Sequence, residues 1–244
     1  MTSQERQGRE GPVVTLDGPA GSGKSTTAKE VARRLGYRHL DSGALYRSVT
    51  FALLDAGVPA RTWPALTRED LVGLGVTVHP TGEGFEIRLR GRPLGPELRS
   101  ADVTAHVSAL ALLPAARAAL LGLQREAGAA GRLVADGRDM GSVVFPRAEV
   151  KVFLVADLKV RARRRLLERR EGEPTPGEVD DEARRIAERD RVDSQREISP
   201  LRRPDGAVDL DTTALSFEAQ VRTVVDLVRS LGTGDAQGVI DRHG

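Results

Sequence analysis

Residues 13–36 of the chain read VVTLDGPAGSGKSTTAKEVARRLG: a short apolar run, a glycine-rich loop and an amphipathic segment. Residues 18–25 match the pattern G-x-x-x-x-G-K-[ST] without a mismatch. The glycines let backbone N–H groups turn inward as an anion-binding nest, and the positive end of a following helix points at the same place. The stretch therefore predicts a strand, a phosphate-binding loop and a helix that together bind a nucleoside triphosphate.

We expect the loop at residues 18–26, called the phosphate loop below, to bind the phosphates of that nucleotide. Lys24 would reach the β- and γ-phosphates, and the Ser25 hydroxyl would be a ligand of Mg²⁺. The loop residues that we expect to bind the nucleoside triphosphate are Gly18, Pro19, Ala20, Gly21, Ser22, Gly23, Lys24, Ser25 and Thr26.

The composition excludes several other classes of protein. Hydrophobic residues make up 39% of the chain and charged residues 30%, and there is no cysteine. No run approaches the roughly 20 apolar residues of a membrane-spanning helix, and the first ten residues lack the apolar part of a secretory signal. A net charge of +2 argues against a general nucleic-acid coat. We therefore expect a cytoplasmic protein with no membrane or nucleic-acid partner.

The fold class follows from short apolar strands that alternate with helical segments. Strands are expected within residues 13–17, 37–43, 132–137, 151–157 and 207–213. This order predicts an α/β fold with a doubly wound parallel sheet of about five strands.

Two segments depart from that alternation. VTVHP and FEIRL alternate apolar and polar residues around TGEG, which predicts a small antiparallel β insert at residues 61–99. A charged helical pair at 158–204, divided by EGEPTPGE, is predicted to be a lid. The core domain would then comprise residues 11–60, 100–157 and 205–232, with disordered tails at 1–10 and 233–244.

Polar clusters follow two of the predicted strands, where α/β sheets bind ligands. In DSGALYR, Asp41 and Ser42 could cap a helix, and Arg47 could grip a second phosphate or lie on the surface. In DGRDMG, Asp136 and Asp139 flank an arginine; either could orient Mg²⁺ through water or accept a hydrogen bond from a base, and the spacing does not separate these uses.

The lid carries two further clusters at helical spacing. Arg161, Arg164 and Arg165 fall on one helix face, and Arg189, Asp193 and Arg196 fall on one face of the returning helix. One interpretation is a solvated face with salt bridges. The other is a lid that closes over the triphosphate, because arginines stabilise the charge that develops during phosphoryl transfer.

Together, GPAGSGKST, LDSGALYR, ADGRDMGSVVFP and ERD-x-x-D-x-x-R-x-x-x-PL resemble the bacterial cytidylate kinases, a family of nucleoside-monophosphate kinases. The resemblance runs in order from about residue 13 to residue 231. LDSGA-x-YR and DGRDMG-x-VVFP are typical of this family rather than of adenylate or guanylate kinases. The proline-rich EGEPTPGE is a departure from the family and predicts a stiffer lid hinge.

The resemblance implies transfer of a phosphoryl group from ATP to CMP or dCMP, with Mg²⁺, by an enzyme that we expect to be monomeric. It implies that Asp139 accepts a hydrogen bond from the cytosine amino group and that Ser108 and Arg117 read the ring. The implied CMP-binding residues are Asp41, Ser42, Arg47, Ser108, Arg117, Arg138, Asp139, Arg189, Asp193 and Arg196. The resemblance implies that residues 18–26 bind ATP, which would also contact Arg161, Arg164 and Arg165. The implied catalytic residues are Lys24, Arg189 and Arg196.

Two alternatives stay open from the sequence. A broader pyrimidine kinase would also accept UMP, and it would be favoured if Ser108, Arg117 and Asp139 did not converge. A P-loop nucleic-acid-binding ATPase would use the arginine-rich arm to track a single strand, with stacking aromatic residues. Aromatic residues make up only 3% of the chain, which argues against the second alternative.

Overall fold

The structure is a computed structural model that describes residues 10–169 and 172–231 of the chain. It divides into two compact units, each described by itself below: unit 1 contains Tyr37–Leu133 with the described residues up to Gly11, and unit 2 contains Pro12–Gly36 and the described residues from Val134 onward. The tails predicted at 1–10 and 233–244 lie outside the described residues, apart from Glu10. The predicted domain boundaries stay a prediction.

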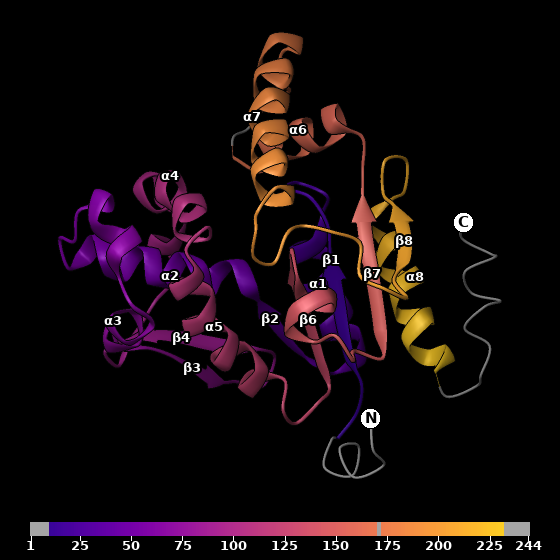
Figure 1. The fold of residues 1–244 in the computed structure, drawn as a ribbon. Helices are drawn as coiled ribbons and strands as arrows, with labels where there is room; N and C mark the ends of the chain where they lie inside the picture. Colours follow the sequence, from indigo (N-terminus) through magenta and orange to yellow (C-terminus); the bar gives the residue numbers. More distant parts are fainter. Residues whose placement is uncertain (1–9, 170–171, 232–244) are drawn as a thin grey trace. The chain divides into compact units, whose positions relative to one another are not determined.

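The main sheet has five strands in the order β2-β6-β1-β7-β8 (Figure 1). These are β2 (Arg38–Asp41), β6 (Leu133–Gly137), β1 (Val13–Asp17), β7 (Val150–Val155) and β8 (Val208–Asp211). All five residues of β1 are buried, as in a parallel strand covered on both faces. Pairing is parallel, with Val14 opposite Val150 and Leu154 opposite Leu210. The predicted α/β class with a five-stranded parallel sheet is confirmed.

The helices of unit 2 begin where the sequence punctuation predicts, but the returning helix ends at Ser194, so the prediction that it carries Arg196 is wrong. The phosphate loop leads into α1 (Lys24–Leu35), which contacts α8 (Phe217–Ser230). Helices α6 (Leu158–Leu167) and α7 (Pro176–Ser194) run side by side above the strand ends of this unit (Figure 1). The predicted break between them is confirmed, because α7 starts with a Thr175–Glu178 capping box.

Unit 1 contains the predicted antiparallel insert. Strands β3 (Val76–Pro80), β4 (Phe85–Leu89) and β5 (Arg92–Pro93) form a three-stranded sheet. Val78 pairs with Ile87 in the antiparallel ladder. The alternation of VTVHP and FEIRL thus predicted both strands correctly.

The helical part of unit 1 surrounds the long helix α2 (Ser42–Asp55). Helix α4 (Ala101–Leu110) packs against α2, and α5 (Pro114–Ala127) begins at the proline that predicted a bend. The short elements η2 (Ala60–Ala65), α3 (Arg68–Gly73) and η3 (Pro96–Arg99) complete the unit. In η2, Trp63 is 2% exposed and its indole N–H donates to the Val58 carbonyl at 3.0 Å.

Among the described residues, no single helix is long and apolar enough to cross a membrane. Helices α4 and α5 reach that length and hydropathy only when taken together, as a pair bent by 100°.

Candidate functional site

The phosphate loop joins β1 to α1 in unit 2, and its glycines have the backbone conformations that the motif requires. Gly18 and Gly23 have φ angles of +147° and +90°, which side-chain-bearing residues rarely adopt. A Cβ atom at Gly18 would also collide with the Leu154 carbonyl oxygen on β7. The loop therefore depends on glycine both for its turn and for its close approach to the sheet.

Lys24 is buried within this loop. Its ammonium donates to the Pro19 carbonyl at 2.6 Å and lies 3.4 Å from the Ser22 hydroxyl. Burial holds the pKa of Lys24 well below its ordinary value, and the charge of Arg138 acts in the same direction. Nearby Asp136, Asp17 and Asp190 raise the pKa of Lys24, and the negative charge of a bound phosphate would favour the charged lysine further.

Ser25 and Asp136 are the residues whose chemistry suits a magnesium ion. The Ser25 hydroxyl donates to the Asp136 carboxylate at 2.5 Å, and Asp136 lies buried at the end of β6. No cluster of three or more His, Cys, Asp or Glu residues suited to a metal occurs in the part of the chain that the structure describes. Mg²⁺ does not require one, since it takes one or two protein oxygens plus water and substrate phosphates. The pair therefore fits Mg²⁺.

Asp17, the last residue of β1, was not predicted from the sequence. Its two carboxylate oxygens accept the backbone N–H groups of Met140 and Gly141 at 2.8 and 2.7 Å. Burial raises the pKa of Asp17 to about 7, against the effect of these two hydrogen bonds. Asp17 thus ties the strand before the phosphate loop to the start of η4 (Met140–Val144), a π-helical turn directly after Asp139. The sequence feature that could have indicated Asp17 is a carboxylate at the end of an otherwise apolar strand.

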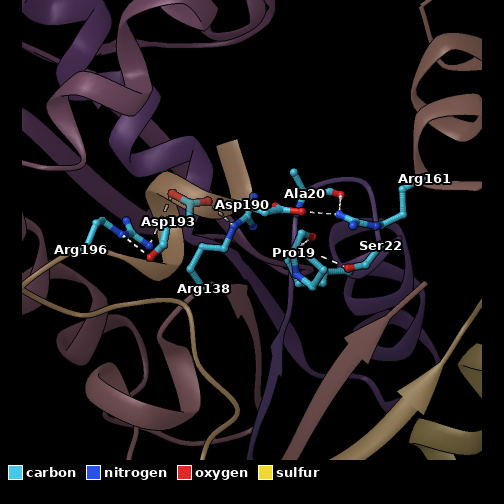
Figure 2. A network of polar contacts seen from close by, with 9 residues as sticks. Pro19, Ala20, Ser22, Arg138, Arg161, Asp190, Asp193 and Arg196 are labelled. Atoms are coloured by element: carbon cyan, nitrogen blue, oxygen red, sulfur yellow. Dashed lines mark hydrogen bonds and ion pairs between the residues drawn. The ribbon is translucent and has the colours of Figure 1, made fainter. Parts of the chain in front are cut away.

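Three of the predicted CMP-binding residues come together in unit 2. The Arg138 Nε atom donates to the Asp193 carboxylate at 2.9 Å, and Arg196 Nε donates to the Asp193 carbonyl at 3.1 Å (Figure 2). Asp193 and Arg196 are each less than a tenth exposed. Arg189 lies half-buried on the same helix, α7, one turn before Asp193. Asp139, which follows Arg138, is 4% exposed.

The three arginines predicted to form one ATP-binding stripe on α6 have different partners. Arg161 donates to the Ala20 carbonyl in the phosphate loop at 3.0 Å. Arg164 donates to the Thr212 hydroxyl at 3.0 Å, and Thr212 in turn lies 3.3 Å from the Ser22 carbonyl. The guanidinium of Arg165 pairs instead with the buried Glu182 of α7 at 3.0 Å.

Two more residues of this network were missed by the sequence interpretation. Asp190 of α7 accepts the Ala20 N–H at 2.9 Å, and Thr212 follows β8. Asp190 adjoins a predicted site residue, Arg189, so its position in the ERD triplet was a signal. For Thr212, the only sequence signal was its position just after a predicted strand.

In unit 1, the residues of the DSGALYR segment are held by local contacts. Asp41 caps α2 by accepting the Ala44 N–H at 3.0 Å, which is the capping interpretation of this residue. The buried Ser42 hydroxyl accepts from the Gln124 side chain at 2.9 Å. Arg47 donates to the Thr104 hydroxyl at 3.1 Å, so its guanidinium faces α4.

The two residues that the resemblance assigns to the cytosine ring also lie in unit 1. Arg117 of α5 is 7% exposed, donates to the Ala111 carbonyl at 3.0 Å and stands 5.6 Å from the centre of the Tyr46 ring. Ser108 is half-buried on α4. Asp139 belongs to unit 2, so the grouping of these three side chains stays a prediction.

Comparison with known proteins supplies the family. The family model for cytidylate kinase matches residues 14–230. A cytidylate kinase from Exiguobacterium sp. is 39% identical over 218 residues, covering 89% of this chain and 96% of that protein. A bifunctional pantoate ligase/cytidylate kinase from Synechococcus sp. is 44% identical over 221 residues, covering 89% of this chain but 44% of that protein. The chain thus spans less than half the length of such bifunctional relatives.

Solved structures give a weaker likeness. A gluconokinase from Sinorhizobium meliloti matches with a TM-score of 0.41 and 17% identity over 93% of this chain and 99% of that chain. A shikimate kinase from Bacteroides thetaiotaomicron matches with a TM-score of 0.39. Likenesses of this size carry no argument about activity.

Proposed function

The chain belongs to the cytidylate kinase family, and on this premise we propose that it transfers the γ-phosphate of ATP to CMP and dCMP, giving ADP and CDP or dCDP. The observation that supports the proposal most strongly is the arrangement within unit 2. A phosphate loop with a buried lysine adjoins the Ser25–Asp136 pair, and the arginine–aspartate group of Arg138 and Asp193 lies in the same unit.

The reaction needs no general base, because the CMP phosphate is already an anion at neutral pH. One of its oxygens forms a bond to the γ-phosphorus of ATP, while the bond from that phosphorus to the β–γ bridging oxygen breaks and ADP leaves. The protein has to position both nucleotides and stabilise charge on the transferring group. We assign this work to Lys24, Arg189 and Arg196.

Mg²⁺ would be held by Ser25, with Asp136 as the neighbouring carboxylate, and would neutralise charge on the β- and γ-phosphate oxygens. The glycine nest and α1 would hold the rest of the triphosphate. Of the α6 arginines, Arg161 and Arg164 are supported as residues near ATP by their links to the phosphate loop. Arg165 has weaker support, since its guanidinium faces Glu182.

Selection of cytosine is proposed to rest on Asp139. A buried carboxylate accepts a hydrogen bond from the exocyclic amine of cytosine, and it repels the O4 carbonyl of uracil. A site built around such a hydrogen bond rejects an analogue that lacks the donor far more strongly than shape alone does. Asp139 is 4% exposed, which makes an unsatisfied pairing costly.

The remaining CMP contacts are carried over from the resemblance. Ser42, Arg47, Ser108 and Arg117 of unit 1 would bind the phosphate and the base, and Arg189 and Asp193 would bind the ribose hydroxyls. Asp41 would support the pocket through its cap on α2. We further propose a monomer that acts in the cytoplasm, which light scattering and cell fractionation would test.

The experiment that tests the function is ADP release from ATP and Mg²⁺ with CMP, dCMP, UMP, AMP and GMP offered separately, and with single-stranded RNA as a further sample. We expect turnover with CMP and dCMP and little with the others. Comparable turnover with UMP would indicate the broader pyrimidine kinase. Stimulation by RNA alone would indicate a nucleic-acid-dependent ATPase and overturn the proposal.

A further inference from the structure

Both polar groups of one phosphate-loop residue, Ala20, are held by the helices that follow β7. The Ala20 N–H donates to Asp190 of α7 at 2.9 Å, and its carbonyl accepts from Arg161 of α6 at 3.0 Å. Arg161 and Asp190 also contact each other at 2.5 Å, which closes a ring of three residues (Figure 2). Hydrogen bonds at Ala20 therefore join the phosphate loop to both α6 and α7.

Apolar packing holds the same residue. The Ala20 side chain belongs to a buried cluster with Ala162 of α6 and with Ala183 and Ile186 of α7. Such close-packed contacts leave little room for one member to move alone. A shift of the phosphate loop at Ala20 must consequently move α7 or break this contact.

Helix α7 has a second attachment one turn further on. Asp193, three residues after Asp190, binds Arg138, which directly follows β6. Arg189 precedes these two aspartates on the same helix, and Arg196 lies just beyond its end, where its Nε atom donates to the Asp193 carbonyl. One rigid helix thus links the ATP-side loop to residues assigned to the second nucleotide.

We propose that Asp190 is a positioning residue that couples the two nucleotide sites, so that ATP in the phosphate loop and CMP on the α7 residues bind more tightly together than apart. The inference rests on the proposed function. Asp190 acts through Ala20 and Arg161 and need not touch either nucleotide. Its effect is a coupling of binding free energies, which is reciprocal between the two ligands.

The charge of Asp190 is essential to this link. Arg161 is 8% exposed, and a buried guanidinium that loses its carboxylate partner is strongly destabilised. Asparagine at position 190 could still accept the Ala20 N–H, but it could not balance the charge of Arg161. The substitution Asp190→Asn therefore weakens the ring while keeping its shape.

The test measures, by titration calorimetry, the affinity for a non-hydrolysable ATP analogue with Mg²⁺, with and without saturating CMP. In the wild type, CMP should raise this affinity at least about fivefold, the lower end of ordinary coupling. In Asp190→Asn, each nucleotide alone should bind within about threefold of wild type, while the coupling falls below about twofold. Thermal melts establish that the variant is folded.

A matched control lies on the same helix. Asp181 is an exposed aspartate of α7 that pairs with Arg184, so Asp181→Asn removes the same charge without touching the ring. It should keep the wild-type coupling. If Asp190→Asn does not fold, Arg161→Lys replaces it, because lysine keeps the charge but cannot reproduce the guanidinium fork. Coupling should then also fall below that of the wild type.

The outcomes separate the two proposals. A wild type that phosphorylates CMP but shows no coupling, or an Asp190→Asn variant with wild-type coupling, overturns the inference and leaves the proposed function intact. A wild type that turns over no monophosphate overturns the proposed function and with it the pairing of sites.

Discussion

The Ser25 hydroxyl and the Asp136 carboxylate meet at 2.5 Å, although they are 111 residues apart in the chain. Ser25 lies in the first turn of α1, and Asp136 lies near the end of β6. The phosphate loop is thereby joined to the DGRDMG segment at the point where its serine is expected to meet Mg²⁺.

This contact predicts the behaviour of Asp136→Asn. The amide keeps the size of the side chain but lacks the negative charge that orients a magnesium ion and its waters. We expect the Mg²⁺ concentration for half-maximal rate to rise about 10- to 100-fold, the usual cost of losing a supporting carboxylate. Initial rates over a magnesium titration measure this. An unchanged titration curve would remove Asp136 from the metal site.

A second prediction concerns Asp139→Ala. Loss of the buried acceptor should lower kcat/KM for CMP by about 100-fold or more, while the affinity for ATP stays within about twofold. Steady-state kinetics with CMP and UMP give the first value, and calorimetry with an ATP analogue gives the second. If the affinity for ATP fell as much as kcat/KM for CMP, Asp139 would support the fold of the site rather than read the base.

The raised pKa of Asp17 predicts a pH dependence of stability. With a folded-state pKa of about 7 and an ordinary value of 3.8, the folded protein keeps a proton that the unfolded chain releases. This proton makes its full contribution to the free energy of unfolding below pH 3.8, and the contribution is lost as the pH rises through 7. Relative to Asp17→Asn, the free energy of unfolding of the wild type should therefore fall over that interval and run parallel above about pH 8.

Urea denaturation of both proteins at a series of pH values measures this difference. The expected total change is at most about 4 kcal/mol, since each pKa unit corresponds to about 1.4 kcal/mol. Parallel curves over the whole range would mean that Asp17 titrates as an ordinary exposed aspartate does.

Lys24→Met separates activity from stability. Methionine has nearly the same length and needs no counter-charge in the buried loop. We expect kcat to fall about 100-fold or more, because the Lys24 ammonium no longer stabilises the transferring phosphoryl group. Removal of a buried charge should leave the melting temperature unchanged or raise it by about 2–4 °C. Retained activity with a lowered melting temperature would contradict the assignment of Lys24.

The elements of the fold could be predicted because their signals are local. The phosphate loop needs three glycines and a following helix, and the strands of the insert show their alternation within five residues each. The helix starts at Pro176 and Pro114 follow from proline and capping chemistry.

The site was harder to predict because its contacts join distant parts of the chain. Asp190 lies 170 residues from Ala20, and Asp17 lies 124 residues from Gly141, so no window of sequence contains either pair. Helical spacing placed Arg161, Arg164 and Arg165 on one face, but it could not show that Arg165 meets Glu182. Helical periodicity predicts which residues share a helix face, but it does not predict which residues contact that face.

The central claim is that the γ-phosphate of ATP ends on the phosphate of CMP. The most direct measurement follows the label from [γ-³²P]ATP with Mg²⁺ and CMP by thin-layer chromatography. The account predicts that the label appears in CDP in step with ADP formation, and that Lys24→Met abolishes both. Label released as inorganic phosphate, with CMP unchanged, would contradict the account and indicate an ATPase.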